Sequence, residues 1–550
     1  MPLSEQEVPV LVVGGSLVGL TTSVLLASHG VRHMLIERHR GTAIHPRAAS
    51  FHQRTMEIFR SLGLQQAVEA AAEREFVQNG AIISVDALSG KELACFYRSF
   101  NQGVEGLSPT SRLFITQIGL EPLLRERARE LGADHHYATE MVSFEQDHAG
   151  VVAMLRPRDG GPERRVRARY LIAADGTHSF VRGQLGIGMD GRGTFADCVT
   201  IYFKADMRAL IGNRNLSVVY VNQPGLLAFF RFSISGDAGF LAVFATFDKD
   251  GTRSHVDQNL SPAHCAALVR AALGVPAEFP VAINDVQPWS ASAATARAFR
   301  QGRVFLAGDA AHLMPPTGGF GGNTGIADAH NLAWKLAMVL KGAAGPPLLD
   351  SYEPERKPQC ELVVEQAYAR YVKRVDPSLP ATNLAPLLDD AAIELGSVYC
   401  SDAILDEEEK RRATALLEDP RKPSGNPGTR VPHIMLHRNG VPVSTHDLAE
   451  SGFVLLAAAG GRNWADSGNA LAAAGIPLQA HRIAPDGDLA NPDGRFEDTV
   501  GIGAQGALLL RPDGVIGWRT CGPHADPHAR LNEVMRQLTF RRLSREKIAG

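Results

Sequence analysis

The sequence predicts an α/β protein that combines alternating strands and helices with a run of antiparallel strands. Three observations lead to this fold class. An apolar strand enters a glycine-rich turn and a helix near the N-terminus, four strand-like segments follow one another between residues 199 and 247, and the tail carries a strand, a hairpin and a helix. At 550 residues, the chain is long enough for about three domains.

Composition and charge exclude several classes of function. A formal charge of -3 provides no field to hold a polyanion or a membrane surface, so we expect no nucleic-acid partner and no membrane association. The six cysteines include no CxxC pair, which indicates free thiols, a reducing compartment and no metal site. Residues Met1 to Glu7 lack the basic start of a signal peptide. These features predict a cytoplasmic protein.

The N-terminal segment has the pattern of a Rossmann-like βαβ unit. Val8 to Val13 is an apolar strand that ends at Gly14-Gly15-Ser16-Leu17-Val18-Gly19, and Leu20 to His29 is compatible with a helix. A second strand, His33 to Glu37, ends in an acidic residue. Such glycines let a pyrophosphate approach the helix N-terminus, and the acid accepts the adenosine ribose hydroxyls. The unit therefore predicts a dinucleotide site.

Ser16 departs from the usual pattern, because it stands where the middle glycine of GxGxxG belongs. A serine is small enough for a phosphate to approach. A glycine turn without any ligand remains an alternative, and the spacing does not decide between NAD and FAD.

Two further strand ends carry acidic residues. Arg169 to Gly176 is a strand that enters an Asp175-Gly176 turn, with Ser179 and Arg182 at the start of a helix. Arg303 to His312 is a buried strand that ends in Gly308-Asp309.

The second of these strands continues into a glycine-rich loop from Pro315 to Gly325, and apolar residues at helical spacing follow from Ile326 to Leu340. The loop exposes backbone N–H groups beside a helix dipole. We expect an anionic or electron-rich ring at this place, with a mobile lid or plain linker as the alternative.

The three motifs together resemble the class A flavin-dependent aromatic hydroxylases of the p-hydroxybenzoate hydroxylase type. The resemblance covers residues 8–370, and the Val304 to Leu336 region is its most specific part. In more detail the chain is similar to actinomycete polyketide hydroxylases of antibiotic biosynthesis, such as the tetracenomycin and aklavinone hydroxylases. These add a C-terminal thioredoxin-like domain.

The resemblance implies a role for each matching position. The pyrophosphate would lie on the first motif, the adenosine ribose beside Glu37 and Arg38, and the ribityl chain at Asp309. Arg47 and Pro316 would lie near the flavin and the path of the pyridine nucleotide, and these two are the candidate catalytic residues. The full set of candidate cofactor-binding residues is Gly14, Gly15, Ser16, Gly19, Glu37, Arg38, Arg47, Gln117, Asp175, Asp309, Pro316, Gly321, Gly322 and Asn323.

The resemblance also implies the reaction. An FAD-dependent monooxygenase would use NADPH or NADH and O2 to hydroxylate an aromatic polyketide or other polycyclic phenol through a flavin C4a-hydroperoxide. A flavoprotein oxidase, a decarboxylative tailoring enzyme and a non-catalytic FAD-binding relative remain alternatives. The sequence identifies no general base and leaves the oligomeric state open between monomer and homodimer.

We expect a discontinuous FAD-binding domain of residues 1–78, 105–190 and 288–400, and a substrate-binding sheet domain of residues 79–104 and 191–287. A thioredoxin-like domain without CxxC would span residues 420–550. Within it, Gly452 to Ala457 is a predicted strand, Ala507 to Trp518 a predicted hairpin, and Pro527 to Leu538 a predicted helix with Asp526 as its N-cap.

Overall fold

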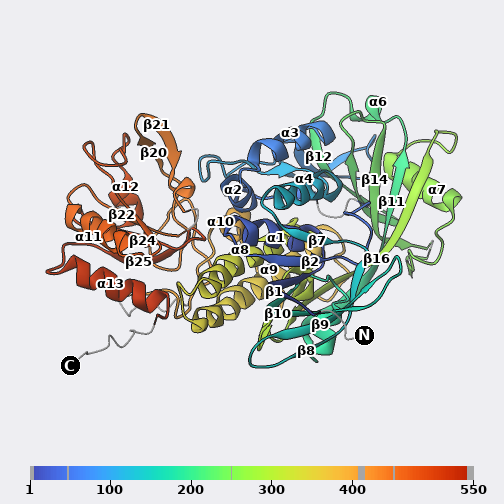
Figure 1. Cartoon of the computed structure of the whole chain (residues 1–550). Helices are drawn as coiled ribbons and strands as arrows, with labels where there is room; N and C mark the ends of the chain where they lie inside the picture. The colour runs from blue at the N-terminus through green and yellow to red at the C-terminus, as the bar shows by residue number, and fades with distance from the viewer. Residues whose placement is uncertain (1–4, 46–48, 249, 407–414, 450–451, 542–550) are drawn as a thin grey trace.

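The computed structural model describes residues 5–45, 49–248, 250–406, 415–449 and 452–541. It is a mixed α/β structure, as predicted, with three principal sheets (Figure 1). None of the helices in the described ranges is long and apolar enough to cross a membrane.

The first sheet brings the three sequence motifs to one edge. Its strand order is β17-β18-β10-β1-β2-β7, with β17 (Arg300–Gln301) and β7 (Asp134–His136) at the ends. The strand β1 (Glu5–Val13) lies between β10 (Arg164–Ala173) and β2 (His33–Ile36). The strands β1, β10 and β18 (Val304–Leu306) are parallel, and Val13, Ala173 and Leu306 pair in one row. Because the carboxyl ends of parallel strands share an edge, the turns after these three residues lie side by side.

Two glycine-rich turns open long helices, and both helices begin earlier than predicted. The first helix, α1 (Leu17–Ser28), starts three residues before the expected Leu20 because Ser16 is its N-cap. The second, α8 (Phe320–Leu340), starts six residues before Ile326. Gly318 and Gly319 have φ angles of 93° and 69°, and this left-handed turn allows the helix to begin at once. Gly321, Gly322 and Asn323 therefore belong to the first turn of α8 rather than to a loop.

The second sheet contains the four strands predicted between residues 199 and 247. They are the long strand β11 (Met189–Lys204) together with β12 (Leu216–Gln223), β13 (Leu226–Phe232) and β14 (Ala238–Phe247). Helix α7 (Pro262–Leu273) packs against the apolar core on one face.

At the far side of β11, the long strand β16 (Ala282–Ala296) pairs with β19 (His312–Leu313). The sheet thus continues directly into the glycine-rich segment of the third motif.

The C-terminal part has a separate four-stranded sheet, β23-β22-β24-β25, beside helices α11 (Arg462–Ala473) and α13 (Pro527–Leu538) (Figure 1). The strand β22 (Phe453–Ala457), the hairpin of β24 (Ala507–Leu510) with β25 (Ile516–Thr520), and α13 confirm the predicted elements. Asp526 caps α13, and its carboxylate accepts from the Ala529 N–H at 2.9 Å. All six cysteines are free thiols, as expected. The three domain boundaries stay a prediction.

Candidate functional site

The first glycine-rich turn is packed so tightly that side chains do not fit. A Cβ on Gly14, whose φ is 107°, would lie 2.2 Å from the Ala174 carbonyl oxygen, and one on Gly19 would lie 1.9 Å from the Gly14 oxygen. Contacts this short do not occur between real atoms, so both positions require glycine. The turn after β1 therefore touches the turn after β10.

Glu37 lies at the end of β2 and holds this turn in place. Its carboxylate accepts from the Gly15 N–H at 2.7 Å and from the His39 N–H at 2.8 Å. A Cβ on Gly15 would lie 2.7 Å from the Glu37 Cβ. The acid predicted for a ribose therefore lies beside the predicted phosphate turn. Arg38, the next residue, is exposed.

Ser16 and Gln117 meet at a buried carboxyl group that the sequence analysis did not select. Glu121 of α4 (Gln117–Glu130) is fully buried and accepts from the Ser16 hydroxyl at 2.5 Å, the Gln117 amide at 3.1 Å and the Ala43 N–H at 2.7 Å. Burial raises the pKa of Glu121, and these hydrogen bonds oppose the rise. A glutamate four residues after Gln117 on the buried face of a helix was the available sequence signal.

Asp175 and Asp309 lie at neighbouring turns. The Asp175 carboxylate accepts from the Ser179 hydroxyl at 2.5 Å and from the Val181 N–H at 3.1 Å, so it stabilises the start of α5 (Phe180–Gln184). Burial raises the pKa of Asp175. Asp309 is exposed between the buried Gly308 and Ala310, and its Oδ2 lies 3.5 Å from the Thr177 hydroxyl.

Arg182 ties these two turns together. Its guanidinium donates to the Ala310 carbonyl at 2.9 Å and to the Thr177 carbonyl at 3.0 Å. On the other side, Cβ atoms added to Gly308 and Gly325 would lie 2.8 and 2.5 Å from a Val18 methyl group. The segments around Gly14, Asp175 and Asp309 therefore converge on one place at the sheet edge.

Asn323 locks the start of α8 to the segment that contains Ser50 and His52. Its amide donates to the Ser50 carbonyl at 3.0 Å and to the Gly319 carbonyl at 2.7 Å. Its side-chain oxygen accepts from the His52 N–H at 2.9 Å and from the Thr55 hydroxyl at 2.6 Å. The sequence predicted a backbone contribution here and missed this side-chain role. Gly321 and Gly322 are half-buried in the same helical turn, and Pro316 is exposed just before it.

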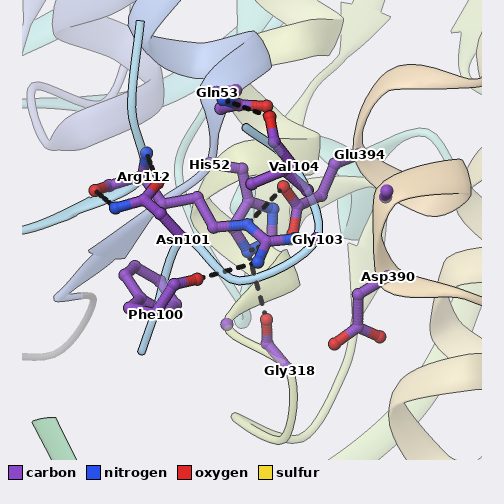
Figure 2. Close-up of polar contacts among 12 residues, drawn as sticks. His52, Gln53, Phe100, Asn101, Gly103, Val104, Arg112, Gly318, Asp390 and Glu394 are labelled. Atoms are coloured by element: carbon purple, nitrogen blue, oxygen red, sulfur yellow. Dashed lines mark hydrogen bonds and ion pairs between the residues drawn. The ribbon is translucent and has the colours of Figure 1, made fainter. Parts of the chain in front are cut away.

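Behind this loop lies a buried ionic cluster, drawn in Figure 2. The His52 imidazole donates from Nε2 to the Gly318 carbonyl at 3.2 Å and lies 3.8 Å from a Glu394 oxygen. Arg112 binds Glu394 through two nitrogens, each at 2.9 Å. Burial lowers the pKa of His52, and Glu394 opposes this shift. Isolated residues of this kind, far apart in sequence, gave no signal of the cluster.

The sheet side of the site is aromatic. We define the aromatic face as Phe229, Phe240 and Phe244 of the second sheet. The centroid of the Phe229 ring lies 5.7 Å from that of Phe240 and 5.6 Å from that of Phe244. Tyr371 of α9 (Tyr352–Arg374) closes one end, with its ring 5.3 Å from Phe244. The ring of His45 lies 5.9 Å from Tyr202 on the same sheet.

The candidate catalytic residue Arg47 comes two positions after His45 and lies outside the described residues.

The N-termini of α1 and α8 indicate whether the site fits FAD. Neither Ser16 before α1 nor Gly319 before α8 caps its helix with its own side chain, and both helix N-termini lie at the shared edge. At α1, the Glu121 carboxylate accepts from the Leu17 N–H. Together with the glycines that exclude side chains and the exposed Asp309, these helix N-termini match a ligand with a pyrophosphate and an electron-rich ring. The residues present fit FAD.

Two family models match the chain. Residues 7–367 match an FAD binding domain, and residues 424–539 match the C-terminal domain of aromatic-ring hydroxylases. The chain belongs to the FAD-binding aromatic-ring hydroxylases.

Individual relatives agree over nearly the whole chain. A 4-methyl-5-nitrocatechol 5-monooxygenase of a Burkholderia species is 47% identical, and the match covers 97% of this chain and 98% of the relative. The tetracenomycin A2 monooxygenase-dioxygenase of Streptomyces glaucescens is 38% identical, with 98% of each chain covered. The crystal structure of aklavinone-11 hydroxylase with FAD and aklavinone superposes with a TM-score of 0.91 at 37% identity, covering 98% of this chain and 100% of that one. The resemblance read from the motifs is confirmed.

Proposed function

We propose that the three motifs bind one FAD molecule along the shared sheet edge. The pyrophosphate lies against Gly14, Gly15, Ser16 and Gly19, near Gln117, and the adenosine ribose beside Glu37 and Arg38. Asp309 holds the ribityl chain, Asp175 borders the phosphates, and Gly321, Gly322 and Asn323 offer N–H groups to the pyrimidine end. The observation that supports this placement is the convergence of the turns after Val13, Ala173 and Leu306 in one row of the sheet.

We infer that the enzyme hydroxylates an aromatic ring with O2, using NADPH or NADH as the reductant. Bound flavin supplies the oxygen activation, which no amino-acid side chain provides. The chain orients both reactants, and the dipole of α8 stabilises negative charge at the pyrimidine end. The apolar aromatic face keeps water away from the reacting centre. Pro316 is a proposed catalytic residue at this centre, and the second candidate, Arg47, lies outside the described residues.

The proposed substrate is a flat polycyclic phenol of the aromatic polyketide type. The aromatic face supports this class because stacked and edge-on rings bind a planar apolar body. Aklavinone bound to the structural relative supports it as well. A second candidate is a single-ring nitrocatechol, because the relative with 47% identity is named for 4-methyl-5-nitrocatechol.

A substrate panel tests the reaction. Purified protein with FAD and NADPH is incubated with anthraquinone phenols, naphthacene phenols and nitrocatechols, and products are identified by mass. We expect a gain of one oxygen with one class of substrate and NADPH consumption that rises with it. NADPH loss without an oxygenated product would favour an oxidase, loss of carbon dioxide a decarboxylative enzyme, and no turnover a non-catalytic relative. Each of these outcomes contradicts the proposal.

The Asp309→Ala variant tests the cofactor site. The ribityl hydroxyls lose a charge-assisted acceptor, so we expect FAD affinity to fall by about tenfold or more. Asp350→Ala is the control, because that carboxylate is 70% exposed and binds Arg300 at the surface. FAD titration by flavin fluorescence measures both variants. Unchanged FAD affinity in Asp309→Ala would overturn the assignment of the third motif.

We also propose three domains with the boundaries given above, since the first and third sheets fall within the FAD-binding and C-terminal ranges. The second sheet falls within the substrate-binding ranges except for β19, the start of β11 and the second part of β16. A cytoplasmic location is proposed from the six free cysteines, which suit a reducing compartment.

A further inference from the structure

Arg231 of β13 is a buried arginine without a counter-charge. Its side chain is sandwiched between two rings, with the guanidinium carbon 4.0 Å from the centroid of Phe76 and 3.9 Å from that of Phe114. Only 4% of the residue is exposed, and its Nε has no hydrogen-bond partner. Among the described residues, no carboxylate forms an ion pair with it. A buried guanidinium in this state is costly unless an anion reaches it.

The other buried arginines differ from Arg231 in this respect. In the part of the chain that the structure describes, each of them binds a carboxylate. These pairs are Arg112 with Glu394, Arg356 with Asp328, Arg370 with Asp390, Arg430 with Glu57, Arg482 with Asp486 and Arg511 with Glu355. The fold thus supplies a carboxylate to every buried guanidinium of the described residues except Arg231.

One acidic group, Glu75, acts on the charge of Arg231, and its carboxylate is hydrogen-bonded to another segment. Glu75 acts on Arg231 only at a distance, and its carboxylate accepts from the Thr116 N–H at 2.8 Å at the start of α4. Burial lowers the pKa of Arg231 to about 9, and Glu75 opposes this shift. At neutral pH the guanidinium is therefore still charged, and its charge is uncompensated.

Arg231 lines a pocket at the end of the β13–β14 hairpin. Ser217 lines the same pocket, and its hydroxyl is a second buried polar group without a partner. The rim carries two exposed apolar side chains, Val77 at 49% and Ile234 at 50% exposure, and the guanidinium of Arg208. The pocket thus combines orphaned polar groups inside with an entrance that carries apolar side chains and the guanidinium of Arg208, which is paired with Asp206. None of the residues lining it belongs to the three glycine motifs.

We propose that this pocket is a second binding site, for a small aromatic carboxylate. Because Phe76 and Phe114 cover both faces of the guanidinium, its N–H groups are available only at its edge. An edge of parallel N–H donors matches the planar carboxylate, which accepts two hydrogen bonds at once. The aromatic body of the ligand lies against Val77 and Ile234 at the rim. The pocket shares no lining residue with the three glycine motifs, and it borders the aromatic face of the proposed substrate site, because Arg231 pairs with Phe240 across the β13–β14 ladder.

Calorimetric titration of the FAD-loaded protein with benzoate tests the proposal. Benzamide, which has the same shape without the charge, and inorganic phosphate serve as comparison ligands. We expect saturable one-to-one binding of benzoate, with benzamide and phosphate weaker by about tenfold or more. No saturable binding of benzoate, or equal binding of benzamide, would overturn the proposal. Stronger binding of phosphate would overturn the carboxylate assignment.

Three variants decide whether benzoate binds in this pocket or in the proposed substrate site. Arg231→Met removes the charge, and Ile234→Asp places a carboxylate at the exposed rim without changing the interior. Both should weaken benzoate binding by about tenfold or more, whereas Arg208→Met, which loses a guanidinium already paired with Asp206, should change it less. If Arg231→Met does not fold, Ile234→Asp alone decides. Unchanged affinity in the folded variants would refute the site.

Discussion

At the scale of single residues, the proposed cofactor site depends on glycines that exclude side chains rather than on groups that bind. Gly14 and Gly19 leave no space for a Cβ, and Glu37 engages the backbone of Gly15 directly. The turn is therefore set before any ligand arrives. Such preorganisation reduces the entropy that binding costs.

Replacement of Gly14 tests this view. Alanine in Gly14→Ala would meet the Ala174 carbonyl and adopt a positive φ, so the turn must shift at a cost of about 1–3 kcal/mol. We expect FAD affinity to fall by about tenfold or more. Gly41→Ala is the matched control, because nothing lies within 4 Å of a Cβ there and its φ is not positive. Equal FAD affinity in the two variants would show that the turn does not hold the cofactor.

At the scale of elements, the first turn of α8 is fixed from outside the helix. Asn323 connects this turn to Ser50, His52 and Thr55 by hydrogen bonds. The Phe320 ring contacts the His52 ring, and the His52 imidazole donates to the Gly318 carbonyl just before the turn. The helix dipole acts on a ligand only if this turn stays in place. The presence of this helix was predictable from the sequence. The hydrogen bonds that hold its first turn were not, because they come from side chains in distant segments of the chain.

Asn323→Ala and Asn323→Asp separate the hydrogen bonds that the Asn323 side chain donates from those that it accepts. Alanine removes all four hydrogen bonds, whereas aspartate keeps the acceptor for His52 and Thr55 and loses the donors to Ser50 and Gly319. We expect FAD affinity to decrease in the order wild type, aspartate, alanine, with about tenfold or more lost in the alanine variant. Fluorescence titration measures all three. If alanine binds FAD as tightly as the wild type, the side chain does not position the helix.

At the scale of the whole molecule, buried charges join the C-terminal part to the helices of the flavin site. Arg511 binds Glu355 of α9 at 2.6 Å and also pairs with Asp513 in the hairpin turn. Lys335 of α8 binds the same glutamate at 2.8 Å, and all four side chains are essentially inaccessible. The C-terminal part has no CxxC motif, and its contacts indicate a structural role in holding α8 and α9.

Removal of Arg511 tests this coupling. Arg511→Met leaves Asp513 buried without its ion-pair partner, and among the described residues Glu355 keeps Lys335 as its one cation, so the free energy of unfolding should fall by about 3–5 kcal/mol. Arg495→Met is the control, because that side chain is 73% exposed. Denaturant unfolding measures both. A loss in Arg511→Met no larger than in the control would mean that the interface does not depend on these charges.

The sequence was sufficient for the strands of the three motifs, the four strands between residues 199 and 247, the glycine turns and the family, because strand periodicity and turn chemistry are local. It did not indicate the long strand β16. It placed α1 and α8 three and six residues late, since glycines at a helix start are indistinguishable from a loop by propensity. It did not reveal Glu121, the His52 cluster or the Arg231 pocket. Each of these depends on long-range contacts and on burial, which a single sequence does not encode locally.

The central claim is that the chain inserts one atom of molecular oxygen into an aromatic ring. Turnover under 18O2, with NADPH and the substrate selected by the panel, tests it directly by mass spectrometry of the product. We expect one 18O atom in each product molecule. A product without the label, or one whose new oxygen comes from labelled water, would contradict it.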